Sequence, residues 1–253
     1  MLNAKVVGDG PPLLILHGLF GSLDNWQTLA RRFGESRTCH LLDLRNHGKS
    51  PHYDAHGYEE MAADVVTYLD ARGTDAVAVM GHSMGGKAAM RLALDYPERV
   101  SQLIVVDMAP RAYVRGHDEI FAAMRRLPLT QNLSRAELDA HLSEEISEPG
   151  IRQFLLKNLR RTPEGYAWKL NLGVIERDYP RILEAVSGEP YEGPTLFIRG
   201  GKSGYVREAD WPEISTLFPR AELVTVAGAG HWVHAEAPAV LAKEVEMWLG
   251  GSS

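Results

Sequence analysis

The sequence predicts an α/β protein with a mostly parallel, doubly wound sheet and an inserted helical cap. Short apolar runs alternate with helical patterns up to Asp107, only helical patterns follow over 111–190, and the alternation resumes at Thr195. Alternation of this kind is typical of a parallel sheet with helices on both faces. We therefore expect a core in two parts, 1–110 and 191–250, a cap over 111–190, and a tail over 251–253.

Composition and charge limit the partners. The 253 residues have a formal net charge of -6, and no cluster of Lys and Arg is longer than a pair, which argues against a nucleic-acid partner. No stretch approaches the roughly 18 apolar residues that span a membrane, and the first residues lack a signal-peptide pattern. The single cysteine, Cys39, excludes an intrachain disulfide and fits a reducing compartment. We expect a cytoplasmic protein, as a monomer or homodimer.

The first predicted strand, 13–16, is a short apolar run that ends in the glycine-rich turn His17-Gly18-Leu19-Phe20-Gly21. Backbone N–H groups in such a turn can face a ligand, and acyl-transfer enzymes use them as half of an oxyanion hole. An ordinary strand-to-helix turn is the alternative interpretation. The next predicted elements are a helix around 26–33, a strand at 39–44 and a helix over 58–71.

A G-x-S-x-G turn at Gly81-His82-Ser83-Met84-Gly85 lies between an apolar strand and a helix that begins with small residues. In this context the serine is held in a strained backbone conformation, and a Cβ at either flanking glycine would collide with a neighbouring element. The hydroxyl of Ser83 would then project at the edge of the sheet. The five-residue pattern also occurs by chance, but the strand and helix around it favour a catalytic serine.

The next predicted strand, 102–107, ends in Asp107, and the helical patterns of 111–190 follow. Each cap helix has an apolar stripe that must be covered, and the nearest cover is the carboxyl edge of the sheet where Ser83 is expected. An insertion packed away from the site is the alternative. If the cap roofs the site, its bulky residues Phe121, Met124 and Phe154 are candidates for substrate contact.

After the cap the sequence predicts a strand at 195–199, a helix over 211–217, a strand at 222–226 and a closing helix from Pro238. The last strand leads through a glycine-rich turn into His231-Trp232. His17, Ser83, Asp107 and His231 thus each follow a predicted strand, and ligands of such sheets bind at the carboxyl ends of the strands.

These residue types match the requirements of acyl transfer. Ser83 supplies a hydroxyl nucleophile, His231 an imidazole base, and Asp107 a carboxylate that holds the imidazole in one tautomer. His231 is chosen among ten histidines because it follows a strand through a glycine-rich turn, whereas His40 and His82 are interpreted as structural.

The chain resembles the α/β-hydrolase superfamily over its whole length, and more narrowly the small bacterial esterases of the YbfF type. The stretches that carry the resemblance are H-G-L-F-G-S-L-D-N (17–25), D-L-R-N-H-G-K-S-P (43–51), G-H-S-M-G-G-K-A (81–88), H-D-E-I-F-A-A (117–123), Q-F-L-L-K (153–157) and A-G-A-G-H-W-V-H-A-E (227–236). Several of these lie outside the general superfamily signature, so the match is specific.

The resemblance implies hydrolysis of carboxylic esters, with acyl-CoA thioesters as a further class, and no metal or organic cofactor. It also implies that the oxyanion donors are the N–H groups of Met84 and of Leu19, with Phe20 as the alternative to Leu19. Phe20, His82 and Trp232, which lie within these motifs, are further candidates for substrate contact.

One departure from the superfamily pattern concerns the acid. Many members carry it after the strand equivalent to 195–199, but Gly200-Gly201-Lys202-Ser203-Gly204 contains no carboxylate. This favours Asp107 as the acid, whereas Asp210 is expected to cap the following helix.

Two other readings compete with ester hydrolysis. The same machinery serves cofactor-free perhydrolases and C–C bond hydrolases, and a receptor could use this fold to bind a ligand without turnover. A complete Ser–His–Asp set argues against the receptor, because pure binding does not need it.

Overall fold

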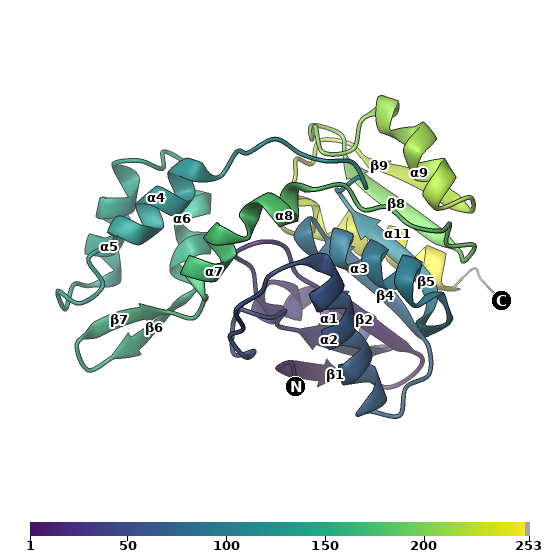
Figure 1. Ribbon diagram of the computed structural model, residues 1–253, viewed down its shortest axis with the longest axis horizontal. Coiled ribbons are helices and arrows are strands. Elements are labelled where there is room, and N and C mark those ends of the chain that lie inside the picture. The colour runs from purple at the N-terminus through teal and green to yellow at the C-terminus, as the bar shows by residue number, and fades with distance from the viewer. Residues whose placement is uncertain (251–253) are drawn as a thin grey trace.

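The computed structural model describes residues 1–250. Their main feature is a seven-stranded sheet in the order β1-β3-β2-β4-β5-β8-β9 (Figure 1). All neighbouring strands are parallel except β1, which pairs antiparallel with β3. The predicted fold class is therefore confirmed. The strands are β1 (Ala4–Val7), β2 (Pro12–Leu16), β3 (Thr38–Leu42), β4 (Val77–His82), β5 (Val100–Val106), β8 (Thr195–Gly200) and β9 (Ala221–Val226).

The central strands are apolar throughout because both faces of the sheet are covered. Leu14 and Leu16 of β2 pack into one core cluster, while Leu13 and Ile15 of the same strand pack into the other. This follows from the alternation of side chains along a strand. One face is covered by α2 (Tyr58–Asp70), α3 (Met84–Asp95) and α9 (Trp211–Leu217), and the other by α1 (Gln27–Phe33) and α11 (Pro238–Gly250). Short helical turns lie at Leu23–Trp26, Pro97–Arg99, Glu208–Asp210 and Val233–Glu236 (α10).

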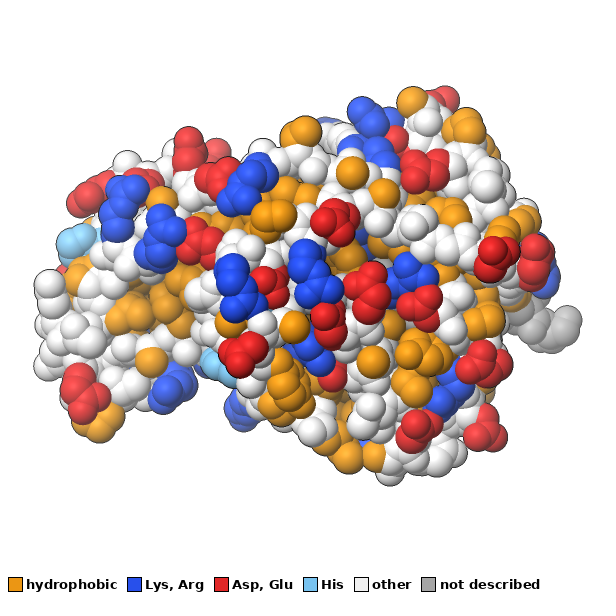
Figure 2. Space-filling model, in the orientation of Figure 1, with side chains coloured by type: hydrophobic (Ala, Val, Ile, Leu, Met, Phe, Trp, Pro, Cys, Tyr) orange, Lys and Arg blue, Asp and Glu red, His pale blue; other side chains and the backbone are white. Residues whose placement is uncertain are grey.

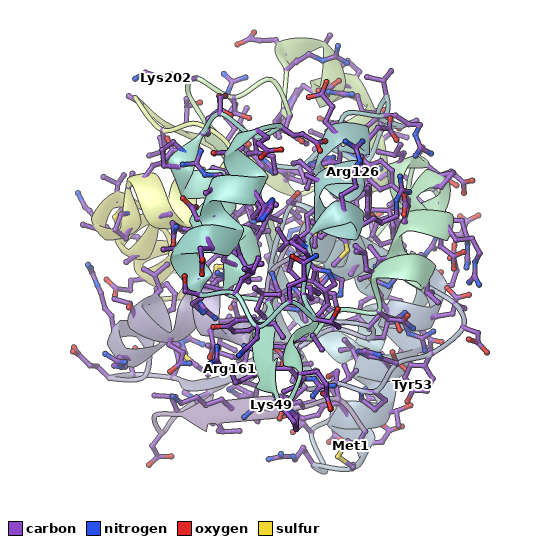
Figure 3. All side chains as sticks on the ribbon, turned by 90° about the vertical axis from the view of Figure 1, so that its left-hand side faces the viewer. Met1, Lys49, Tyr53, Arg126, Arg161 and Lys202 are labelled. Carbon is purple, nitrogen blue, oxygen red and sulfur yellow. The ribbon has the colours of Figure 1, made fainter. Side chains whose placement is uncertain are left out.

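The segment between β5 and β8 lies beside the sheet rather than in it (Figure 1). Seen from that end of the molecule, it stands in front of the core, with Arg126 and Arg161 on it (Figure 3). Its elements are α4 (Asp118–Arg126), α5 (Arg135–Ser143), α6 (Pro149–Leu156), β6 (Leu159–Thr162), β7 (Gly165–Trp168), α7 (Leu172–Arg177) and α8 (Tyr179–Leu183). We call residues 111–190 the cap; these domain limits stay a prediction, and the predicted tail 251–253 lies outside the described residues.

The hairpin of β6 and β7 corrects the expectation that the cap contains only helices. Its two strands have four residues each and pair antiparallel from Leu159–Trp168 to Thr162–Gly165. Such short strands give no readable alternation, and β6 consists largely of the polar residues Arg160, Arg161 and Thr162. Gly165 permits the turn, because it has a φ of +132° and any Cβ there would lie 2.3 Å from the carbonyl oxygen of Leu129.

The face of the molecule shown in Figure 2 carries charges of both signs in close alternation. Ion pairs join neighbouring elements, such as Arg181 of α8 with Glu60 of α2 at 3.0 Å. Within residues 1–250, no helix combines the length and the apolar character that crossing a bilayer requires.

Candidate active site

Ser83 lies at the turn between β4 and α3, with a φ of 56° and a ψ of -120°. A non-glycine residue reaches this backbone conformation only under constraint. The flanking glycines are required by close backbone contacts: a Cβ on Gly81 would lie 2.0 Å from the carbonyl oxygen of Gly85, and one on Gly85 would lie 2.5 Å from that of Leu16. The strand-to-helix turn predicted from the sequence therefore has the expected local geometry.

The structure brings Ser83, Asp107 and His231 together at the carboxyl edge of the sheet. His231 Nε2 lies 3.0 Å from Ser83 Oγ, and His231 Nδ1 lies 2.8 Å from Asp107 Oδ2. A carboxylate only accepts hydrogen bonds, so Nδ1 carries the proton and Nε2 is left to accept from the serine hydroxyl. The three side chains thus form one hydrogen-bonded chain that can move the proton of Ser83 Oγ to His231.

Asp107 is fully buried, and two further donors hold its carboxylate. The N–H of Gly200 donates to Oδ1 at 2.9 Å, and the hydroxyl of Ser203 donates to Oδ2, the oxygen that also accepts from His231. The loop after β8, which lacks an acid in this sequence, therefore contributes a hydroxyl to the same network. Sequence reasoning missed Ser203, because a serine in a glycine-rich loop has no distinguishing pattern.

Asp210 lies outside this network. Its carboxylate forms ion pairs with Arg111 at 3.0 Å and with Arg207 at 2.9 Å, and it accepts from the Arg207 backbone N–H. Burial opposes ionisation of Asp210, but the hydrogen bonds from Arg207 and Arg111 outweigh it and keep its pKa below the usual value. Asp210 occupies the N-cap position of α9, as expected, but its side chain makes no capping hydrogen bond.

Several groups hold the loop of His231. The carbonyl oxygen of His231 accepts from His82 Nε2 at 2.8 Å, and Glu236 accepts from the N–H groups of Gly230 and Trp232 on either side of the histidine. Burial lowers the pKa of His82 well below its usual value, so it is a neutral donor. The ring of Tyr205 stacks on the imidazole of His231 at 3.8 Å. These contacts restrict the imidazole to one orientation.

The structure distinguishes the two candidate donors of the first oxyanion loop. The N–H of Phe20 donates to His47 Nε2 at 3.3 Å, and His47 Nδ1 donates in turn to the carbonyl oxygen of Arg45. Burial lowers the pKa of His47 well below its usual value, which leaves Nε2 as an acceptor. The N–H of Phe20 is therefore occupied. Within the described chain, the N–H groups of Leu19 and Met84 have no such partner, and both residues line the cavity beside Ser83.

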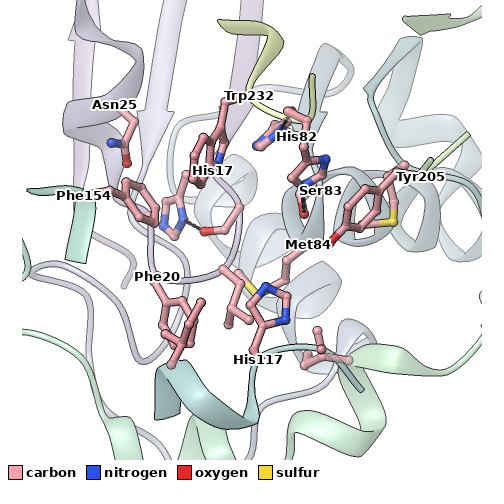
Figure 4. Close-up of a pocket in the computed structure, with 18 of the residues that line it drawn as sticks. His17, Phe20, Asn25, His82, Ser83, Met84, His117, Phe154, Tyr205 and Trp232 are labelled. Carbon is pink, nitrogen blue, oxygen red and sulfur yellow. Dashed lines mark hydrogen bonds between the residues drawn. The ribbon is translucent and has the colours of Figure 1, made fainter. Parts of the chain in front are cut away.

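A cavity of about 460 Å³ opens above Ser83 between the core and the cap. Phe20, His82 and Trp232 line it from the core, and Phe154 lines it from α6 (Figure 4). The rings of Phe154 and Trp232 lie 6.0 Å apart. These four candidates for substrate contact thus lie around the reacting groups.

Phe121 and Met124 do not line the cavity, which corrects the expectation for these two residues. They lie on the buried face of α4, where Phe121 packs against Phe20 at 5.1 Å and Tyr179 at 5.2 Å. Ile120, one position earlier, faces the cavity instead. The apolar spacing of the helix indicates which residues are buried, but it does not distinguish the core from the cavity.

The serine lies in a strained turn at the carboxyl edge of a parallel sheet. It is within hydrogen-bonding distance of a histidine that also contacts a buried aspartate. This arrangement is that of α/β hydrolases. A family model described as the alpha/beta hydrolase fold matches residues 11–238. The chain belongs to this family.

Individual relatives make the similarity more specific. The chain is 40% identical over 242 residues to the esterase YbfF of Escherichia coli, which covers 95% of this chain and 94% of that protein. It is 42% identical over 236 residues to the sn-1-specific diacylglycerol lipase ABHD11 of Xenopus laevis, with 90% and 76% covered. The solved structure of a marine microorganism esterase matches with a TM-score of 0.96 at 38% identity and covers 98% of both chains. Sequence and structure thus group this chain with the esterases of the family, in agreement with the predicted class of carboxylic ester hydrolases.

Proposed function

We propose that the protein is a serine hydrolase that cleaves carboxylic esters through Ser83, His231 and Asp107. The observation that carries the proposal is the hydrogen-bonded chain from Ser83 Oγ through both ring nitrogens of His231 to the buried carboxylate. A protein that only binds esters would not need a serine in a strained turn beside an imidazole with a fixed tautomer.

The geometry suggests how the reaction proceeds. As Ser83 Oγ attacks the carbonyl carbon, His231 Nε2 takes the hydroxyl proton, and the N–H groups of Leu19 and Met84 stabilise the tetrahedral oxyanion. The bond to the leaving oxygen then breaks, His231 protonates this oxygen, and an acyl-enzyme remains on Ser83. A water molecule then attacks the acyl carbon while His231 takes its proton. The bond between the acyl carbon and Ser83 Oγ breaks, His231 returns the proton to Oγ, and the carboxylic acid leaves. Asp107, held by Gly200 and Ser203, stabilises the imidazolium in both steps.

The substrate class is a small acyl ester, with acyl-CoA thioesters as a second class for the same machinery. Support comes from the relatives, which are named as esterases and as a diacylglycerol lipase, and from the cavity, whose cap side is lined by apolar residues such as Ile151, Phe154 and Leu155. An apolar wall of this kind suits an acyl chain.

A substrate screen tests the proposal. The purified protein is offered p-nitrophenyl esters of two to twelve carbon atoms and the matching acyl-CoA thioesters, and release of the alcohol or thiol is measured. We expect turnover of the oxygen esters with a clear optimum of chain length. No turnover of any ester or thioester would refute the proposal and favour the ligand-receptor reading.

The perhydrolase and C–C bond hydrolase readings use the same residues. They predict peracid formation from hydrogen peroxide and an acid, or cleavage of a β-diketone-like substrate, at rates above ester hydrolysis. The cytoplasmic location and the oligomeric state, monomer or homodimer, stay predictions from the sequence.

A further inference from the structure

His117 lies in the cap directly before α4, and it lines the same cavity as Ser83. Its ring projects from the cap side below Met84 and Ser83 (Figure 4). The rings of Phe20 and Tyr179 lie 6.1 Å and 5.6 Å from it. The mechanism proposed above gives this imidazole no role, although it is a polar group in a largely apolar wall.

The hydrogen bonds around Tyr179 determine which nitrogen of His117 carries the proton. Tyr179 is only 1% exposed, so its hydroxyl group is buried. The hydroxyl proton then needs an acceptor, because a buried donor left without one costs about 1–3 kcal/mol. The described chain offers His117 Nδ1, which is hydrogen-bonded to this hydroxyl. Tyr179 therefore donates to Nδ1, and the neutral imidazole carries its proton on Nε2.

Two observations leave this Nε2–H group available to a ligand. Burial lowers the pKa of His117, and the nearby His231 lowers it further, so the ring is neutral near pH 7. Within residues 1–250, the hydrogen bond to Tyr179 is the one contact of this kind found for the ring. A single N–H donor therefore faces the cavity from the cap, between apolar neighbours such as Ile120 and Phe20.

A bound ester would already have partners for the two oxygens of its reacting group. The N–H groups of Leu19 and Met84 receive the carbonyl oxygen, and His231 serves the leaving oxygen. A donor on the opposite wall therefore fits a third oxygen. A substrate without one would leave this donor unpaired once water is expelled, and unpaired polar groups are what make polar sites selective.

On the basis of the proposed ester hydrolysis, we propose that His117 is a substrate-binding residue whose Nε2–H donates a hydrogen bond to a third oxygen of the substrate. The substrate class is thereby narrowed to esters that carry a hydroxyl or oxo group beyond the scissile carboxyl group. This oxygen belongs either to the acyl chain or to the alcohol.

Two matched substrate pairs distinguish these sources. The acyl pair is p-nitrophenyl butyrate and p-nitrophenyl 3-hydroxybutyrate, and the alcohol pair is propyl butyrate and 2,3-dihydroxypropyl butyrate. For each pair we measure the ratio of kcat/KM for the hydroxyl-bearing ester to that for the plain ester. In the wild-type protein we expect this ratio to be at least about tenfold in one of the pairs.

His117→Phe removes the donor and retains a planar ring, and we expect it to reduce that ratio to near one. His117→Gln, which restores an N–H at similar reach, should recover most of it. His141→Phe, on the exposed surface of α5, is the matched control and should leave the ratio unchanged.

The inference would be overturned if, for both pairs, the ratio of kcat/KM values were the same in the wild-type protein and in His117→Phe. This includes the case in which His117→Phe lowers kcat/KM equally for both members of each pair. Such a result leaves ester hydrolysis itself intact. Absence of turnover by the wild-type protein on these four esters and on every ester and thioester of the substrate screen would instead refute the proposed function.

Discussion

The core and the cap both contribute walls to the cavity, but they hold their residues in different ways. On the core side, strand ends and backbone groups fix the reacting atoms: Asp107 directly follows β5 and accepts from the N–H of Gly200, and the carbonyl oxygen of His231 accepts from His82. On the cap side, side chains on short helices and on the loop before α4 form the wall, and hydrogen bonds and ion pairs of side chains join the cap to the core. One is the hydrogen bond from Asn158 Nδ2 to the carbonyl oxygen of Phe20 at 2.7 Å.

The difference indicates a division of labour between the two regions. Reaction at a carbonyl group needs placement to within a fraction of an ångström, which buried strand ends and paired backbone groups provide. Choice among substrates depends on the shape and polarity of a wall, which side chains on a separate segment can vary without moving the reacting atoms. Changes in the core should therefore alter kcat, and changes in the cap should alter which substrate is preferred.

The largest expected effect comes from the core residue at the turn. Ser83→Ala removes the nucleophile but hardly changes packing, so we expect kcat for p-nitrophenyl butyrate to fall by at least about 10⁴-fold. The thermal midpoint should change by no more than a few degrees. Retention of more than about a hundredth of the wild-type kcat would show that the elbow serine is not the nucleophile.

The second test addresses Asp107, the buried carboxylate that contacts His231. Asp107→Asn keeps the shape of the side chain but allows the wrong tautomer of His231, and a loss of about 10² to 10⁴ in kcat is expected. The hydroxyl of Ser203, which contacts the same oxygen, can partly compensate and explains the lower limit. Near-normal turnover by this variant would place the acid elsewhere.

The third test addresses the cap wall. Phe154→Ala enlarges the cavity on the α6 side, so the ratio of kcat/KM for octanoate to that for butyrate esters should rise by roughly tenfold. Met247→Ala, an exposed change on α11, is the control. An unchanged chain-length profile in Phe154→Ala would mean that the core, rather than the cap, selects the acyl chain.

The fourth test concerns Lys87, which lies at the contact between the core and the cap. Lys87 of α3 is fully buried, donates to the carbonyl oxygen of Glu184 beyond α8, and lies over the ring of Tyr113. Burial, and secondly the charge of Arg111, lowers its pKa from 10.5 to about 7. Between these values the unfolded chain binds one proton more at this site than the native protein, so native stability rises with pH. Below about pH 7 both states are protonated and the penalty for the buried charge is complete.

Lys87→Met removes this dependence. We expect the unfolding free energy of the variant, relative to that of the wild-type protein, to be most favourable near pH 7. This advantage should narrow by about 1–2 kcal/mol when the pH is raised to 9. Urea unfolding of both proteins at the two pH values measures it. A difference that is the same at both values would show that Lys87 stays charged in the native state.

The smallest effect on turnover is expected at Asp210, the second carboxylate of the core. Asp210→Asn weakens the ion pairs to Arg111 and Arg207, which should lower the unfolding free energy by about 1–3 kcal/mol. Because Asp210 contacts neither His231 nor Ser203, kcat should stay within about threefold of the wild-type value. A collapse of kcat in this variant, with stability unchanged, would contradict the assignment of the acid to Asp107.

Sequence reasoning predicted the core better than the cap. The strands that precede Ser83 and Asp107 are continuous apolar runs, and such runs are typical of strands that are buried on both faces of a parallel sheet. β1 was not predicted, because it has four residues and is only partly buried. In the cap, the apolar spacing does not distinguish residues that line the cavity from buried ones: Phe121 and Met124 both lie in the buried cluster, and Phe121 packs against Phe20 and Tyr179.

The sequence by itself determined the buried strands of the core, the strained turn at Ser83 and the residues that follow these strands, because these depend on local sterics and on the spacing of apolar side chains. Only the tertiary structure decided that the N–H of Phe20 is taken by His47, that Ser203 reaches Asp107, and that Tyr179 orients His117. The partners in these three contacts lie 27, 96 and 62 positions apart in the chain. Contacts between such distant residues depend on how whole layers pack, and no local pattern in the sequence records that packing.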